Sequence, residues 1–204
     1  MRRLTGGGTD GNERLTALTA IPLLALLVVE GVTVVILRPL LSVHLFVGLL
    51  LIPPVGLKLA STGYRFVRYY TGNALYRRKG PPPILLRATA PIVAVASVIV
   101  LASGVWLLLA GPTARDAVLP LHKISFIVWA AFTGLHILGH VTALPPAAAS
   151  EYGRRRSGPG RLDGRAGRAL AIALSLAAGV ALAMLLLPHF GPWENAMAHH
   201  HHHG

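Results

Sequence analysis

Long apolar blocks alternate with short polar segments along most of this chain. Each block reaches the length of about 20 apolar residues that an α-helix needs to cross the hydrocarbon core of a bilayer. Turn-forming proline and glycine residues separate neighbouring blocks, as at Arg38-Pro39 and at Gly111-Pro112. The pattern predicts five transmembrane helices, at about Leu15–Leu37, Leu40–Leu59, Ile84–Ala110, Val118–Leu144 and Ala169–Leu187.

Length and composition favour a membrane protein over a soluble one. The 204 residues are 53% hydrophobic, and a soluble chain of this size could not bury so many apolar helices on every side. We therefore expect an all-α integral membrane bundle over residues 15–188. A mobile polar N-terminus (residues 1–14) would precede the bundle, and a C-terminal tail (residues 189–197) would follow it. Residues 198–204 contain a run of histidines and are interpreted as a purification tag.

Basic residues are concentrated in the segments between the apolar blocks. The N-terminus, residues 61–87 and residues 145–168 carry most of them, whereas the alternate turns carry few. Because an excess of Lys and Arg stays cytoplasmic, the N-terminus is expected inside and the C-terminus outside a bacterial cytoplasmic membrane. The net charge of +12 is thus interpreted as membrane topology and lipid contact, and not as binding of nucleic acid.

Several classes of chemistry lack the residues that they require. The chain has no cysteine, which excludes disulfides, thiolate metal sites and cysteine nucleophiles. It has no glycine-rich phosphate loop, no His-Glu-x-x-His zinc motif and no Ser/His/Asp set that the spans would bring together. No nicotinamide or flavin domain is present, so a redox function would need a quinone or another redox subunit as its partner.

Ionisable side chains inside the spans are the strongest functional signal, because each costs a few kcal/mol in a bilayer. They are Glu30, His44, Lys58, His122, His136 and His140. His122 and His136 are 14 positions apart, which on a helix is about 21 Å along the axis and nearly the same face. His44 and Lys58 have the same offset on the second span.

The matched offset brings residues of the second and fourth spans to equal depths. Both spans run from outside to inside in the predicted topology, so His44 and His122 share an outer depth. Lys58 and His136 share an inner depth in the same way. A haem held between two helices needs one axial imidazole from each helix at matching depth, and His44 with His122 meets this requirement.

The neighbours of these residues suit a porphyrin. Gly48 lies one turn from His44 and would leave room for a flat ring, as would Gly134 and Gly139 beside His136. Propionate groups need cationic or hydrogen-bonding partners near the membrane surface. Candidate partners are Lys123 and Arg38 outside, and Arg65 or Arg68 inside.

The histidine spacing resembles that of the bis-histidine four-helix membrane b-type cytochromes, a superfamily related to the haem-bearing half of respiratory cytochrome b. A set of actinobacterial membrane proteins related to these is also similar in the stretches LLSVHLFVGLLLIPP, GYRFVRYYTG, YRRKGPPP and LHKISFIVWAAFTGLHILGH. The resemblance covers about Leu40 to Leu144. It implies a helix bundle with haem b between the second and fourth spans, and electron transfer across or along the membrane.

The number of haems stays open at one or two. A two-haem member of the superfamily would carry a histidine where this chain has Lys58. Lys58 could ligate iron as a neutral amine, His136 or His140 could find another axial partner, or only the outer haem would be present. His136 is thus a third candidate iron ligand, and Lys58 is otherwise a snorkelling residue at the interface.

Two other functions are compatible with the sequence. His136 and His140 lie four positions apart on one helical face, a spacing that suits zinc or copper in a metal-binding membrane protein or transporter. The chain could also be a structural subunit of a membrane complex, in which the histidines only form hydrogen bonds. Glu30 could relay protons, pair with a buried cation or stay neutral, and the sequence names no partner for it.

Overall fold

The described part of the chain is entirely helical wherever it forms regular structure. The structure, a computed structural model, describes residues 8–77, 84–141 and 165–199. Its elements are α2 (Gly8–Val35), α3 (Leu41–Tyr70), α4 (Ala74–Arg77), α5 (Ile84–Ala110), η1 (Pro112–Ala114), α6 (Arg115–Val141), α8 (Arg165–Leu186), η3 (Leu187–His189) and α9 (Phe190–His199). The all-α prediction is confirmed.

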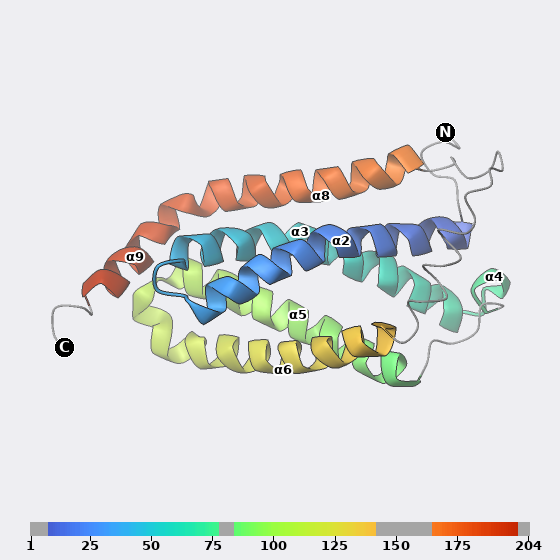
Figure 1. The fold of residues 1–204 in the computed structure, drawn as a ribbon, viewed down its shortest axis with the longest axis horizontal. Helices are drawn as coiled ribbons and strands as arrows, with labels where there is room; N and C mark the ends of the chain where they lie inside the picture. The colour runs from blue at the N-terminus through green and yellow to red at the C-terminus, as the bar shows by residue number, and fades with distance from the viewer. Residues whose placement is uncertain (1–7, 78–83, 142–164, 200–204) are drawn as a thin grey trace.

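Within the described residues, five segments are long and apolar enough to cross a membrane, which confirms the predicted number of spans and indicates a multi-pass membrane protein. They are Gly11–Val35, Leu41–Tyr70, Ile84–Ala110, Pro112–Leu138 and Ala166–Ala198. Successive long helices run in alternate directions along one bundle axis, so that α3 and α6 run the same way (Figure 1). α2 begins near one end of the bundle and α9 lies near the other (Figure 1). Which end faces the cytoplasm stays a prediction.

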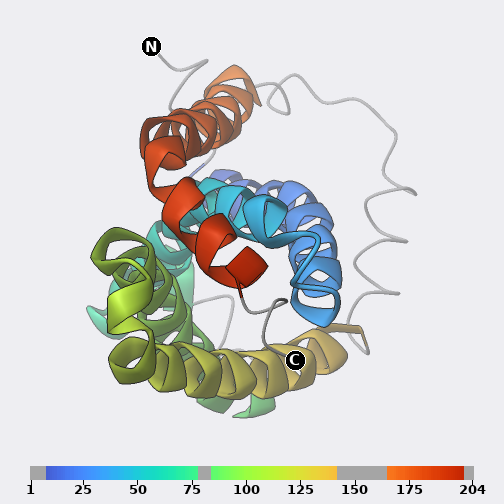
Figure 2. The ribbon, with the colours of Figure 1, turned by 90° about the vertical axis from the view of Figure 1, so that its left-hand side faces the viewer.

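α3 is the helix that joins the bundle together, because it packs against α2, α5 and α8. Viewed along the bundle, α3 lies between α2 and α8, and the α5–α6 hairpin lies to one side of them (Figure 2). The hairpin turn is tight. Gly111 adopts a positive φ of 75°, a conformation that glycine allows, and Pro112 starts the 3₁₀ turn that leads into α6.

The backbones of α8 and α3 approach closely at Gly179. A Cβ atom added to Gly179 of α8 would lie only 2.4 Å from the carbonyl oxygen of Leu50 in α3, so only a residue without a side chain permits this contact. α9 contacts the start of α3, where Ser42 donates a hydrogen bond to Glu194. A buried apolar cluster there contains Leu49, Leu108, Ala183 and Phe190.

The outer surface of the helices is strongly apolar. Ile84, Leu185 and Ile21 are 86%, 73% and 68% exposed, and many other large apolar side chains are also exposed. A soluble monomer rarely exposes so much contiguous apolar surface. In a bilayer, by contrast, these side chains would face lipid, which agrees with the five membrane-length helices.

The second span is longer than predicted. α3 continues past Leu59 as far as Tyr70, and it keeps Pro53 and Pro54 inside the helix. The helix ends where Gly72 adopts a positive φ of 84°. The prolines therefore do not divide the second span into two helices.

The ends of the chain also contain helix. α2 begins at Gly8, inside the segment 1–14 for which a mobile polar N-terminus was expected, and α9 covers most of the expected tail over residues 189–197. Residues 142–144 of the predicted fourth span lie outside the described residues, as does most of the interpreted tag.

Candidate functional site

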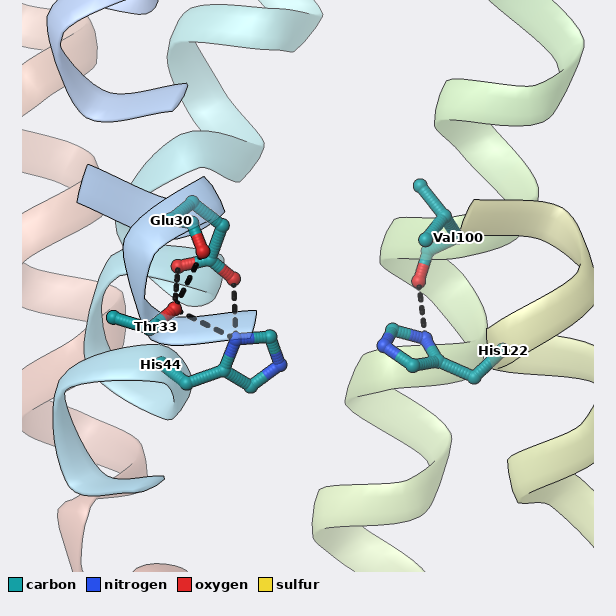
Figure 3. Close-up of polar contacts among 5 residues, drawn as sticks. All are labelled: Glu30, Thr33, His44, Val100 and His122. Carbon is teal, nitrogen blue, oxygen red and sulfur yellow. Dashed lines mark hydrogen bonds and ion pairs between the residues drawn. The ribbon is translucent and has the colours of Figure 1, made fainter. Parts of the chain in front are cut away.

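His44 of α3 and His122 of α6 face each other across the bundle. Their ring centroids are 6.4 Å apart and their ring planes are nearly perpendicular, at 81°. Figure 3 shows the two imidazoles pointing toward one another from the two helices, with one nitrogen edge of each ring turned to the space between them. The sequence-based expectation that the two residues meet at equal depth agrees with this arrangement.

The far nitrogen of His44 is held by α2. Its Nδ1 atom lies 2.8 Å from Oε1 of Glu30 and 3.1 Å from Oγ1 of Thr33. Thr33 directs its own hydroxyl proton to the backbone carbonyl of Glu30, at 2.6 Å, which leaves its oxygen free to accept from the ring beside it (Figure 3). With these two oxygens as acceptors, a neutral His44 would carry its proton on Nδ1 and its lone pair on Nε2.

The far nitrogen of His122 is held by α5. Its Nδ1 atom lies 3.0 Å from the carbonyl oxygen of Val100 and 3.1 Å from Oγ of Ser103. A carbonyl can only accept, so His122 also carries its proton on Nδ1 and its lone pair on Nε2. Gly104 makes room for the ring, because a Cβ atom there would lie 3.1 Å from Cε1 of His122.

The separation of the two rings matches the separation expected for two imidazoles that bind one metal ion from opposite sides. Two metal–nitrogen bonds of about 2 Å on opposite sides of one ion place the ring centroids about 6 Å apart, and the observed separation is 6.4 Å. Metal-bound histidines usually donate their other N–H to a carboxylate or a backbone carbonyl. Both kinds of acceptor are present here. The site is also sheltered, since the side chains of His44 and Glu30 are only 20% and 14% exposed.

Lys58 and His136, the two residues predicted to share the inner depth of the bundle (the lysine level), are arranged differently from the histidine pair. Nζ of Lys58 donates a hydrogen bond of 2.7 Å to the backbone carbonyl of Thr16 in α2. Nδ1 of His136 lies 3.0 Å from Oγ1 of Thr89 in α5. Each side chain is thus bound to the helix beside it. His140 belongs to α6, but its side chain lies outside the described residues.

The remaining predicted residues lie around these two levels. Gly48 faces Glu30, because a Cβ atom there would lie 3.5 Å from Oε1 of that residue. Lys123 is exposed beside a shallow surface hollow at the start of α6. Arg65 is half-buried, and the guanidinium of exposed Arg68 lies 5.9 Å from the centre of the Tyr64 ring.

The sequence reasoning missed the hydrogen bonds that aim these side chains. Three polar contacts join α5 and α6 in antiparallel register: Ser103 with His122, Ser97 with Trp129, and Thr89 with His136. The signal was present, because His122, Trp129 and His136 recur at intervals of seven and so share one face of α6. The hydroxyl residues of α5 are their partners, and hydroxyl groups often bridge membrane helices.

Among the described side chains, no group of three or more His, Asp or Glu residues is placed to hold a metal ion. No known protein family matches the chain, and no curated protein or solved structure matches it.

Proposed function

We propose that this chain is a membrane b-type cytochrome that holds one haem between α3 and α6, with His44 and His122 as the axial ligands. The observation that carries the proposal is the facing pair of imidazoles, 6.4 Å between centroids, each bonded through Nδ1 to a residue of a neighbouring helix. Haem iron supplies reversible one-electron chemistry when bound, so the chain would transfer electrons.

The donor set favours haem over a bare metal ion. A structural zinc site uses four protein ligands, whereas among the described residues no group of three or more metal-binding side chains is placed to hold an ion, and the Glu30 carboxyl lies against Nδ1 of His44. A porphyrin brings four equatorial nitrogens of its own, so the protein needs to supply only the two axial ligands. Two facing histidines are therefore a complete set for haem and an incomplete one for zinc.

The arrangement of Lys58 and His136 at the lysine level supports one haem per chain over two. The Lys58 ammonium is engaged by the Thr16 carbonyl at 2.7 Å, and no imidazole of α3 lies at that depth. His136 would then act as a hydrogen-bonding residue of the α5–α6 hairpin. Its role as an iron ligand would require a partner that α3 does not provide.

The proposed redox partners follow from the proposed haem and the membrane-length helices. Haem iron exchanges single electrons, and five of the described segments are long and apolar enough to cross a membrane, so the proposed partners are a quinone in the membrane or another redox subunit. The proposed location is the bacterial cytoplasmic membrane with the N-terminus inside. Lys123 and Arg38 are exposed residues near the histidine pair in sequence and are the proposed partners of the propionates.

A visible absorption spectrum tests the proposal. The tag must be removed first, because its histidines bind haem and metals. The purified protein should be red, contain about one haem per chain and show a Soret band that shifts on reduction by dithionite. A colourless protein that takes up no haemin in detergent would reject the proposal, and stoichiometric zinc without iron would favour the alternative of a metal-binding membrane protein.

A further inference from the structure

Glu30 is an acidic side chain in a helix that contributes no ligand to the proposed haem. It lies within α2, and its side chain is only 14% exposed. Its Oε1 atom lies 2.8 Å from Nδ1 of His44. An acidic residue at membrane depth is costly and needs a physical reason, and this contact supplies one.

Residues of both α3 and α2 lie against the contact between Glu30 and His44. Gly48, one turn along α3 from His44, leaves space for the carboxyl group, since a Cβ atom there would lie 3.5 Å from Oε1. Thr33, nearly one turn along α2 from Glu30, donates to the Glu30 backbone at 2.6 Å and places its oxygen 3.1 Å from the same ring nitrogen. The Thr33 hydroxyl also lies 3.4 Å from Oε2 of Glu30, so the carboxyl group contacts side chains of both α2 and α3.

The two facing imidazoles differ in what holds them. Nδ1 of His44 lies 2.8 Å from a carboxyl oxygen, whereas Nδ1 of His122 donates to a neutral backbone carbonyl at 3.0 Å. A carboxylate acceptor withdraws the Nδ1 proton more strongly than a carbonyl does, and this raises the electron density at Nε2 and the basicity of the ligand. The imidazoles of His44 and His122 thus have different partners at Nδ1, a carboxyl group and a backbone carbonyl.

We propose that Glu30 is the positioning residue that fixes His44 as its Nδ1–H tautomer and makes it the more electron-donating of two unequal axial ligands. This inference rests on the proposed haem site. A more basic ligand stabilises the oxidised iron relative to the reduced iron, so Glu30 holds the midpoint potential lower than two carbonyl-backed histidines would.

The first test uses the haem-free protein and therefore does not depend on cofactor loading. Nitrogen NMR of the tag-free chain labelled with ¹⁵N-histidine reports which ring nitrogen of His44 is protonated. Nδ1–H is expected in the natural chain and in Glu30→Gln, because the amide oxygen can still accept. Glu30→Ala should weaken this preference, because only the Thr33 hydroxyl then remains beside Nδ1. The Nε2–H tautomer in the natural chain would overturn the role of Glu30 without any variant.

The second test uses the haem-loaded protein and measures its midpoint potential. Glu30→Gln should keep the haem and raise the potential, because a neutral acceptor donates less to the ring. Glu30→Ala should lower haem affinity by about 10-fold or more, as loss of a hydrogen-bonding partner of a metal ligand typically does.

Two matched controls separate this effect from a general disturbance of packing. Thr33→Val removes the hydroxyl beside the same nitrogen, and Ser103→Ala removes the hydroxyl beside the ring of His122 while the Val100 carbonyl remains. Both should change the potential less than Glu30→Gln does. Equal shifts in all three variants would overturn the inference. A chain that binds no haem would instead reject the proposed function itself, whatever the tautomer of His44.

Discussion

The histidine level of the bundle, at His44 and His122, and the lysine level, at Lys58 and His136, are built from the same two helices with the same offset of 14 residues. At the histidine level the two side chains face each other, at 6.4 Å between ring centroids. At the lysine level each side chain is bound to a flanking helix, Lys58 to α2 and His136 to α5. Helical spacing therefore sets depth and face, and the partners on neighbouring helices decide where each side chain points.

The largest expected effect is loss of haem at the histidine level. His44→Ala or His122→Ala removes one axial ligand, so each variant should lose most of its bound haem or hold it as five-coordinate iron. His136→Ala is the matched control, since His136 is also held through Nδ1 by a hydroxyl of α5. The haem content per chain, measured by the pyridine haemochrome spectrum, should stay near that of the natural protein in His136→Ala. A loss of half the haem in this control would instead indicate a second haem at the lysine level.

A smaller effect is expected from two matched glycines of the α5–α6 hairpin. Gly104→Ala adds a methyl group 3.1 Å from Cε1 of His122 and should displace the ring by a few tenths of an ångström. Gly134→Ala adds a methyl group with no heavy atom of a neighbouring element within 4 Å. Haemin titration should therefore give weaker binding for Gly104→Ala and unchanged binding for Gly134→Ala. Equal affinities for the two variants would contradict the close fit of His122 against α5.

Substitution of Lys58 sharpens the contrast between the levels. Lys58→Met keeps an apolar stem but removes the hydrogen bond to Thr16. Haem content and spectrum should not change, and the bundle should lose about 1 kcal/mol of stability, as for other hydrogen bonds between membrane helices. Unfolding in mixed detergent measures the stability. A changed haem spectrum would show that Lys58 is an iron ligand after all.

The smallest expected effect lies midway between the two levels. Trp129→Phe removes the hydrogen bond of 2.9 Å from Nε1 to Oγ of Ser97 and should cost about 0.6 kcal/mol of stability. Trp106→Phe is the control, because Trp106 is 58% exposed on the apolar surface. Thermal unfolding that ranks the two variants the other way would argue against the polar contacts as the link between α5 and α6.

The sequence predicts the helices well because their length and apolar composition are local properties. It also predicts that His44 and His122 meet, since two helices running in the same direction preserve matching depths. It does not predict that Glu30 holds His44, because that contact depends on how α2 rotates against α3. The extension of α3 to Tyr70 was missed for a related reason: Ser61–Tyr70 is polar enough to resemble a loop, but Ser61 is tied to α2 by hydrogen bonds from Thr16 and Asn12.

Electron paramagnetic resonance of the oxidised, tag-free protein tests most directly the proposal that His44 and His122 bind the same haem iron. We predict a low-spin ferric signal from iron with two axial imidazoles. In both His44→Ala and His122→Ala this signal should disappear with the haem or convert to a high-spin signal. A low-spin signal that survives unchanged in either variant would contradict the account, because the iron would then be held by other residues.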